Sequence, residues 1–574
     1  MLKQAELTIS ILMNLLIKNH NIVYLFPFNN LFKKPLYLNY MKKTLYLIIL
    51  AAVTISSCKK SNKTGTGDNS NPTGPSKNGT VIQLAQDSIF LYAKENYLWF
   101  DQLPDYATFK PRSFTNAAPL TALSDEMDAL SQYAINPVGG KPYEYYIYDP
   151  GRAKYSFIDD GTETGALNGV KGDFGFDYNY WDVDDIRITY VYPGSPAGLA
   201  GFKRGYQIVS INDNTSLSFD GVSNGQTYGD GSRKNINYVY NAIFNSGNIK
   251  MTVKRPDGTT LTESFSTGNY NVNPVLKDTV FNAGASHKIG YIVFNSFTSD
   301  DNADPKLDAA FANFTTQGIT DLVVDLRYNG GGYVSTAEYL DNLIVPTSKD
   351  GTNMYNTYFN STLVAGKETL LKNQWRRYSD GLHNLAEIDY SLNSQYNKPN
   401  FVKKGSLNVP RVFFIIGGGT ASASELTINN LRPVMDVQFV GETSYGKPVG
   451  FFDIQINKYT MFTPEFSTKN SAGQGDYYDG FTPNTTGYPG IADYDGIDKD
   501  FGDPEENLLK HIISYVKTGT YSLPVKVTQS ISSSNARAFT LQASHDKTML
   551  RNKDKFTGMI FNSKRVKLKV TQKK

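Results

Sequence analysis

The sequence contains a single cysteine, Cys58, in 574 residues, and only five histidines. One cysteine excludes an intramolecular disulfide framework and any site of the C-x-x-C type. The histidines are scattered, and none lies in an H-E-x-x-H motif, so a zinc hydrolase is not expected and no metal site is assigned. A basic excess is also lacking, since 57 lysines and arginines stand against 54 acidic residues. Nucleic-acid binding is therefore not expected.

The composition is that of a folded protein with many loops. Hydrophobic residues make up 40% of the chain, aromatic residues 13%, and there are 48 glycines. At about 150 residues per domain, the length predicts two to four domains. Several regions of different character are therefore expected along the chain.

A secretion signal is expected near the N-terminus. Residues 41–43 (Met-Lys-Lys) precede a short apolar run, residues 45–53, and then small residues that end at Cys58. The run is shorter than the roughly 20 residues that span a bilayer. The pattern resembles a bacterial lipoprotein signal, which implies that residues 41–57 are removed and that Cys58 carries a lipid.

The segments on either side of this signal are interpreted differently. Residues 1–40 resemble no known leader, and we interpret them as an extension from an upstream start codon. Residues 58–80 are rich in glycine, serine, asparagine and proline without apolar periodicity. Such a composition predicts a flexible tether between a membrane and a folded domain.

Four further regions follow the tether. Apolar residues at helical spacing, interrupted by prolines, predict a small helical cap over residues 81–154. Short alternating strands predict a β-rich module over residues 155–268. Residues 280–520 alternate strands (289–294, 322–326, 412–416 and 437–440) with helices, including one expected at 421–431, which indicates an α/β core. Residues 521–574 offer weak strands and basic residues, and no role is assigned to them.

The β-rich module has the residues of a peptide-binding domain. A Phe174-Gly175-Phe176 loop is followed by the segment 192–202, which reads Tyr-Pro-Gly-Ser-Pro-Ala-Gly-Leu-Ala-Gly-Phe, and then by a strand. This arrangement resembles a PDZ domain. The resemblance implies that a peptide with a free apolar C-terminus adds as a strand, and that its carboxylate binds the backbone N–H groups of Phe174, Gly175 and Phe176.

Candidate catalytic residues lie in the α/β core. Residues 417–425 (Gly-Gly-Gly-Thr-Ala-Ser-Ala-Ser-Glu) stand between a buried strand and a helix, so a serine hydroxyl there would lie at a helix N-terminus. These hydroxyl side chains are also ordinary helix caps, which is the alternative interpretation. Lys447 follows the next strand in a glycine-marked turn. A lysine shielded from water has a lowered pKa and can accept a serine proton without any histidine.

Together these residues resemble the C-terminal processing peptidases, or tail-specific proteases. The family places its catalytic lysine 25 positions after its serine, which implies Ser422 as nucleophile and Lys447 as general base, with Ser424 expected to cap the helix. Residues 325–332 (Asp-Leu-Arg-Tyr-Asn-Gly-Gly-Gly) match a third family motif. The resemblance implies that the backbone N–H groups of Gly331 and Ala423 form the oxyanion hole.

Two positions depart from the family pattern. Pro448 stands where the family usually has glycine after the lysine, and Phe451 stands where it usually has glutamine. Pro448 favours an extended conformation at Lys447. The absent glutamine removes a group that would orient the lysine, and Gln455 is a weak candidate to replace it.

The resemblance implies an α/β fold with a crotonase-like spiral core, a PDZ domain and a helical cap. It also implies a membrane-tethered serine endopeptidase in the bacterial envelope, facing the periplasm or the cell surface, that needs no metal or organic cofactor. The alternative is a non-catalytic peptide-binding lipoprotein with a vestigial protease core. A penicillin-binding acyltransferase is excluded because Glu425 and Thr427, not lysine, stand three residues after Ser422 and Ser424.

Overall fold

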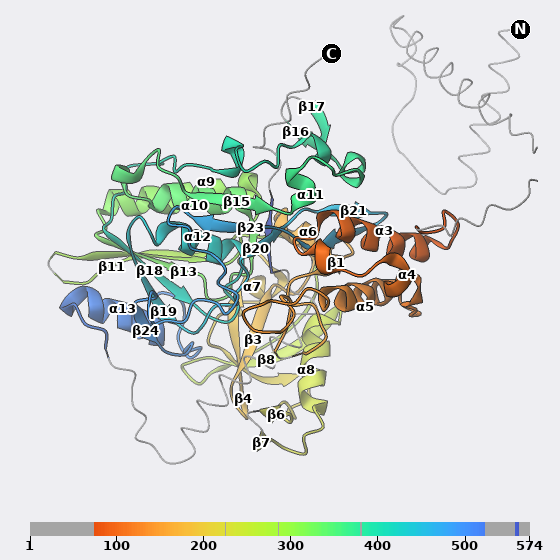
Figure 1. Cartoon of the computed structure of the whole chain (residues 1–574). Coiled ribbons are helices and arrows are strands. Elements are labelled where there is room, and N and C mark those ends of the chain that lie inside the picture. The colour runs from red at the N-terminus through yellow and green to blue at the C-terminus, as the bar shows by residue number, and fades with distance from the viewer. Residues whose placement is uncertain are drawn as a thin grey trace, which may run out of the picture. The chain divides into compact units, whose positions relative to one another are not determined.

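A computed structural model of the chain describes residues 74–522, except for residues 148, 224–225, 285 and 379–380, together with residues 557–561 (Figure 1). The expected signal sequence, Cys58 and most of the expected tether lie outside the described residues. Within the part of the chain that is described, no helix is long and apolar enough to cross a membrane.

Three helices open the described part of the chain. They are α3 (Val81–Asn96), α4 (Tyr106–Phe109) and α5 (Pro119–Ser131). A capping box begins α3, because Thr80 and Gln83 each accept a hydrogen bond from the backbone N–H of the other. Ile89 on α3 and Leu123 and Met127 on α5 are at most 1% exposed. The apolar spacing in the sequence thus corresponds to the faces that these helices bury.

The next region forms a five-stranded antiparallel sheet with its own hydrophobic core. In order across the sheet, its strands are β3 (Phe176–Asp182), β4 (Asp185–Val191), β5 (Gln207–Ile211), β8 (Asn248–Lys254) and β9 (Thr260–Ser266). Helix α8 (Lys234–Phe244) packs Ile236 and Val239 into this core. Among the described strands of the sheet, β3 pairs only with β4. Its outer edge is therefore suited to adding a further strand.

The α/β core is built on a six-stranded sheet. Its strands, in spatial order, are β11 (Val275–Asn282), β12 (Lys288–Phe294), β13 (Asp321–Asp325), β18 (Arg411–Ile416), β19 (Asp436–Gly441) and β24 (Gly490–Ala492). All pairs are parallel except β11 with β12. The four strands expected from the sequence in this region are confirmed. Their near-continuous burial is typical of parallel strands covered on both faces.

Helices cover the two faces of this sheet (Figure 1). Alternate residues such as Val324 and Phe414 pack in one core with α9 (Asp300–Gln317), α10 (Val334–Ile344) and α12 (Ala423–Leu431). The intervening residues, such as Val323 and Phe413, pack in a second core with α13 (Asn507–Thr518). The helix expected at 421–431 corresponds to α12, which begins two residues later than predicted.

A second, mixed sheet adjoins the first. Its strands, in spatial order, are β14 (Gly331–Tyr333), β25 (Gly558–Ile560), β20 (Val449–Phe451), β23 (Pro464–Asn470) and β15 (Tyr355–Phe359). Strand β25 pairs in parallel with both β14 and β20. This strand belongs to the C-terminal region to which the sequence assigned no role.

Shorter α-helices and strands also occur in the described part. They are α6 (Thr162–Leu167), α7 (Pro196–Leu199), α11 (Ser361–Val364), β1 (Phe157–Asp159), β2 (Val170–Lys171), β6 (Val222–Ser223), β7 (Gln226–Thr227), β10 (Tyr270–Asn271), β16 (Trp375–Tyr378), β17 (Gly381–Asn384), β21 (Ile454–Ile456) and β22 (Tyr459–Phe462). Strand β1 pairs with β22, which joins the segment after the N-terminal helices to the core.

A buried ion cluster ties the β-rich region to the α/β core. Arg204, just before β5, approaches Asp495 to 2.6 Å, and Arg327 approaches the same oxygen to 2.6 Å. Arg327 also lies 2.8 Å from Glu506. Burial alone would raise the pKa of Asp495, but the two guanidinium groups outweigh it and hold that pKa at about 2. Because Arg327 belongs to the 325–332 motif, the β-rich region is anchored directly to the candidate site.

Candidate active site

A tight turn between β18 and α12 carries Ser422. The Thr420 hydroxyl closes this turn, since it accepts a hydrogen bond from Gly417 N–H (3.0 Å) and donates one to the Leu326 carbonyl (2.8 Å). Ser422 is the N-cap of α12 and has φ of 61°. A residue with a side chain rarely adopts such a conformation, which costs on the order of 1–3 kcal/mol. A strained serine at a strand-to-helix turn is the geometry of a nucleophile elbow.

The Ser422 hydroxyl is buried and unsatisfied. Its side chain is 0% exposed, and its Oγ makes no hydrogen bond within the described residues. Leaving a buried hydroxyl unpaired costs about 1–3 kcal/mol, so such groups are rare outside functional sites. The Ser422 hydroxyl is thus available to bind or react with a group that is absent from the structure.

Ser424 has a different role from the one expected. It lies in the first turn of α12, and its Oγ donates a hydrogen bond to the Asn329 carbonyl (2.9 Å). The expectation that Ser424 caps the helix is wrong, because Ser422 occupies the N-cap position. Ser424 instead joins the helix to the loop before Gly331.

Lys447 is fully buried in the turn after β19. Burial lowers the pKa of its amine well below the usual value; Glu144 and Glu425 oppose the shift, and Lys154 adds to it. The amine lies 3.8 Å from the centre of the Phe451 ring. Phe451 therefore supplies an apolar ring face at the position where the family usually has glutamine, while Gln455 is exposed and bonds to Thr460.

One carboxylate connects the serine turn to the lysine turn. Oε2 of Glu425 accepts hydrogen bonds from the backbone N–H groups of Ser422 (2.9 Å) and Lys447 (2.8 Å). Oε1 accepts from Ser444 Oγ (2.6 Å) and Gly446 N–H (2.7 Å). The sequence interpretation gave Glu425 no role. The available signal was its position three residues after the N-cap serine, which is a capping-box spacing.

The two expected oxyanion residues are neighbours. A β-carbon on Gly331 would lie 2.9 Å from the backbone nitrogen of Ala423, and φ of Gly331 is 105°, so glycine is required there. The Gly331 N–H itself donates to Asn329 Oδ1 (2.9 Å). The structure brings Gly331 and Ala423 together, and the use of their N–H groups as an oxyanion hole stays a prediction.

The Phe174-Gly175-Phe176 segment leads into β3, which begins at Phe176, and an internal carboxylate already binds it. The Gly175 N–H donates to Asp173 Oδ1 (2.8 Å), and the Tyr270 hydroxyl donates to the same oxygen (2.7 Å). The Lys171 amine lies 3.1 Å from the other oxygen of Asp173. A peptide carboxylate that binds Gly175 must therefore displace Asp173.

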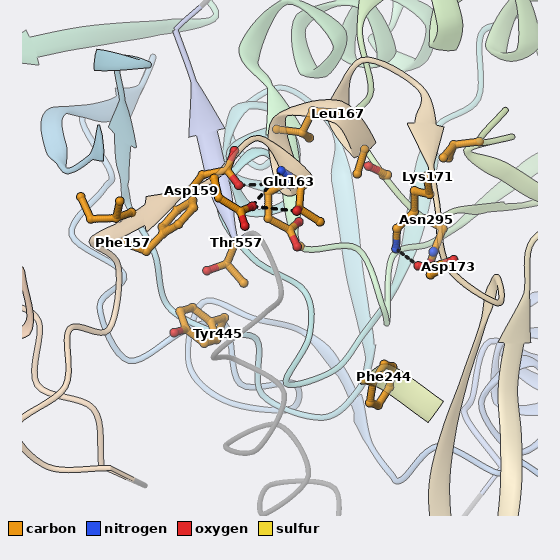
Figure 2. A pocket seen from close by; sticks show the side chains of 18 of the residues that line it. Phe157, Asp159, Glu163, Leu167, Lys171, Asp173, Phe244, Asn295, Tyr445 and Thr557 are labelled. Atoms are coloured by element: carbon orange, nitrogen blue, oxygen red, sulfur yellow. Dashed lines mark hydrogen bonds and ion pairs between the residues drawn. The ribbon is translucent and has the colours of Figure 1, made fainter. Parts of the chain in front are cut away.

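A cavity of about 440 Å³ reaches from the Phe174-Gly175-Phe176 loop to Gly331, without contacting Ser422 or Lys447. Gly175 and Phe176 line it, as do Gly331 and Tyr445. Figure 2 shows Lys171 and Asp173 on one side of this cavity and Tyr445 and Thr557 on the other. A peptide held at the edge of β3 can thus reach the neighbourhood of Gly331 without crossing the protein interior.

Comparison with known proteins places the core in a family. Residues 288–484, which contain all three motifs, match the model of peptidase family S41. This part of the chain is a peptidase family S41 domain. The resemblance drawn from the three motifs is thereby confirmed for the core. Members of this family of C-terminal processing peptidases are serine-type peptidases.

The curated relatives that match this chain are named carboxy-terminal processing proteases. The carboxy-terminal processing protease CtpA of Bacillus subtilis is 23% identical over 313 residues, which are 53% of this chain and 52% of the relative. A carboxyl-terminal-processing protease of Synechocystis is 25% identical over 290 residues, which are 50% and 54%. The chain thus spans about half the length of these relatives. A solved structure from Bacteroides fragilis assigned to S41 proteases is 21% identical and covers 75% of this chain and 97% of its own, with a TM-score of 0.48.

The first prediction is that Ser422 and Lys447 act as one unit. Ser422→Ala, Lys447→Ala and the double variant should each reduce peptide hydrolysis to a similar floor, because residues that act together give non-additive losses. Ser424→Ala should keep most activity and lose about 1 kcal/mol of unfolding free energy, from the hydrogen bond to Asn329. Hydrolysis rates and denaturant unfolding measure both effects. Substantial activity in Lys447→Ala would contradict the pairing.

The second prediction concerns Glu425 as a positioning residue. Glu425→Gln replaces one of the two acceptor oxygens with an NH2 donor, so two of the four donors lose their acceptor. The change should lower hydrolysis and cost about 3 kcal/mol of unfolding free energy. Glu425 also raises the pKa of Lys447. The midpoint of the pH–rate profile should therefore move to lower pH, which a purely structural role would not cause. Glu263→Gln, on the exposed face of β9, is the matched control. An unchanged midpoint would argue against this role.

Proposed function

We propose that the protein is a membrane-anchored serine endopeptidase that selects substrates by their C-terminal tails. Catalysis is assigned to Ser422 and Lys447 of the S41 domain. The observation that carries this proposal is a strained, buried and unpaired serine hydroxyl whose turn shares the Glu425 carboxylate with a desolvated lysine. The names of the relatives, which are carboxy-terminal processing proteases, support the substrate class.

In the proposed reaction, the neutral amine of Lys447 accepts the hydroxyl proton of Ser422, and Oγ attacks the peptide carbonyl carbon. The N–H groups of Gly331 and Ala423 stabilise the oxyanion, once the Gly331 N–H has left Asn329. Lys447 then passes the proton to the departing amine. Water hydrolyses the acyl-enzyme and regenerates the serine. Burial favours this chemistry because it keeps Lys447 neutral closer to physiological pH.

Tail selection is assigned to the β-rich region, interpreted as a PDZ domain. Three observations support this interpretation: β3 is an edge strand, the Phe174-Gly175-Phe176 segment leads into it, and residues near the end of α8 line the same cavity. A substrate carboxylate would take the place of Asp173 at the Gly175 N–H and beside Lys171. The tail would then be held while the preceding chain enters the S41 domain.

Envelope localisation is part of the proposal. Cys58 ends a lipoprotein-like signal, and the tether after it would hold the S41 domain at a membrane surface, facing the periplasm or the exterior. This assignment depends on sequence pattern alone, because Cys58 lies outside the described residues.

A non-catalytic peptide-binding lipoprotein is the second candidate function. Two observations favour it. The Lys447 amine donates to the Thr557 carbonyl, and the Gly331 N–H donates to Asn329, so neither is directed at a substrate. Hydrolysis that disappears in Ser422→Ala would exclude this candidate.

The third prediction tests tail selection with one peptide in two forms, free acid and C-terminal amide. The free acid with an apolar last residue should be cut faster, because backbone N–H groups and Lys171 bind a carboxylate better than an amide. Ser422→Ala is the inactive control. Equal rates and equal affinities would remove the tail-specific part of the proposal.

Asp173→Asn sharpens the same test. It removes the carboxylate that competes for Gly175, so affinity for the free acid should rise about tenfold, which corresponds to roughly 1.4 kcal/mol. Affinity for the amide should change little. Asp257→Asn, in the exposed turn between β8 and β9, is the matched control. A fall in affinity for the free acid would place the carboxylate site elsewhere.

The fourth prediction is that Cys58 carries the anchor. Cys58→Ala should release the protein from membranes without changing its thermal unfolding, because several acyl chains anchor firmly whereas an unmodified chain does not. Membrane fractionation after a high-salt wash measures the effect. Full retention of Cys58→Ala in the membrane fraction would show that the anchor lies elsewhere.

A further inference from the structure

A short C-terminal strand lies directly beside the candidate dyad. In β25, Gly558 is opposite Gly331, and Ile560 is opposite both Tyr333 on β14 and Phe451 on β20. The Gly558 N–H donates to the Gly330 carbonyl (3.0 Å), and the Phe561 N–H donates to the Phe451 carbonyl (2.9 Å). The segment is thus an extended strand, held on both sides by backbone hydrogen bonds.

The start of this segment reaches the catalytic groups. The Thr557 carbonyl accepts a hydrogen bond from the Lys447 amine, and Thr557 lines the cavity shown in Figure 2. A β-carbon on Gly331 would collide with the Gly558 carbonyl oxygen and would also lie beside the Ala423 nitrogen. The main chain of residues 557–558 therefore passes the lysine and the expected oxyanion residues, as a substrate main chain must.

The side chains of the segment pack into the hydrophobic core. Met559 is 0% exposed and Ile560 is 4% exposed. The Phe561 ring lies 5.5–5.8 Å from three other rings, those of Phe359, Phe452 and Phe466. A peptide in this place would approach the backbone of Gly331 closely with its first residue. Its next two residues would bury apolar side chains, and the one after them an aromatic ring.

We propose that the slot between β14 and β20 is the groove in which the S41 domain takes its peptide substrate as an added strand, and that residues 557–561 occupy it as a tethered, substrate-like competitor. The proposal rests on the proposed function. In this arrangement the Lys447 amine donates to the Thr557 carbonyl, and the Ser422 hydroxyl has no hydrogen-bond partner among the described residues. A segment on the same chain acts at an effective concentration of about millimolar, so weak contacts suffice to hold it in place.

This occupancy defines a substrate class for the groove. Favoured substrates are extended chains with a small residue opposite Gly331, two apolar residues and then an aromatic one. The requirement is separate from that of the β-rich region, which addresses the free carboxylate at the end of the tail. A protein substrate would satisfy both when it carries such a segment upstream of an apolar C-terminus.

The test begins with a full chain in which Met559→Asp/Ile560→Asp empties the slot and Ser422→Ala prevents cleavage. A labelled peptide of residues 555–563 should bind this chain at least tenfold more tightly than it binds Ser422→Ala with its own segment intact. A scrambled peptide should bind neither, and a peptide with alanine for Phe561 should bind more weakly. Equal binding of the labelled peptide by the two chains, or binding by neither, would overturn the proposal.

This measurement does not depend on catalysis, so its failure leaves the assignment of Ser422 and Lys447 untouched. In the active enzyme, Met559→Asp/Ile560→Asp should raise kcat/KM for a reporter peptide at least tenfold, and the 555–563 peptide should inhibit it competitively. A folded variant, with unchanged thermal unfolding, that is no faster would count against the proposal.

Hydrogen exchange in Ser422→Ala with its own segment intact covers the case in which the aspartate variant does not fold. Added 555–563 peptide should speed exchange at the amides of Gly558 and Phe561. Unchanged protection would identify β25 as a permanent part of the sheet and overturn the proposal.

Discussion

The site depends on the carboxylate of Glu425. This buried group accepts hydrogen bonds from the serine turn and from the lysine turn, which lie on opposite sides of β19 in the sequence. Each turn alone is unfavourable, since Ser422 has a strained backbone and Lys447 an amine removed from water. Four hydrogen bonds to one carboxylate offset that cost and fix the two turns relative to each other. Glu425 thus fixes the position of the Ser422 turn relative to the Lys447 turn.

The 325–332 motif lies at the same edge of the sheet as the serine and lysine turns. The 325–332 motif follows β13; its Arg327 reaches Asp495, which also binds Arg204 of the β-rich region, and its Gly331 begins β14 beside Ala423. The β-rich region, to which we assign binding of the peptide end, is thus tied by ion pairs to the loop expected to stabilise the oxyanion. In the proposal above, a peptide tail at β3 and a substrate strand beside β14 would belong to one bound chain.

The sequence predicted the core well, because parallel strands and their helices are encoded locally by apolar runs and periodicity. It also located the Ser422, Lys447 and Gly331 motifs, whose residue types and spacing are local. It could not show that β25 pairs with β14 and β20, which lie more than 100 residues earlier in the chain, since this is a tertiary pairing. The contact of Asp173 with the Gly175 N–H is local, and the sequence analysis overlooked it. The cap was misassigned to Ser424 because several hydroxyl residues stand together, and only the backbone shows which one precedes the helix. The role of Phe451 depends likewise on where the Lys447 amine points.

The most direct test of the central claim is the pH dependence of Ser422 labelling by a fluorophosphonate probe in the full chain. If buried Lys447 is the base, the labelling rate should rise with pH to a plateau. The midpoint of the rise should give an apparent pKa well below the value of free lysine, about 10.4. Labelling of Lys447→Ala should be slow at every pH. A wild-type rate that climbs through that pH without a plateau, or equal labelling of Lys447→Ala, would contradict the account.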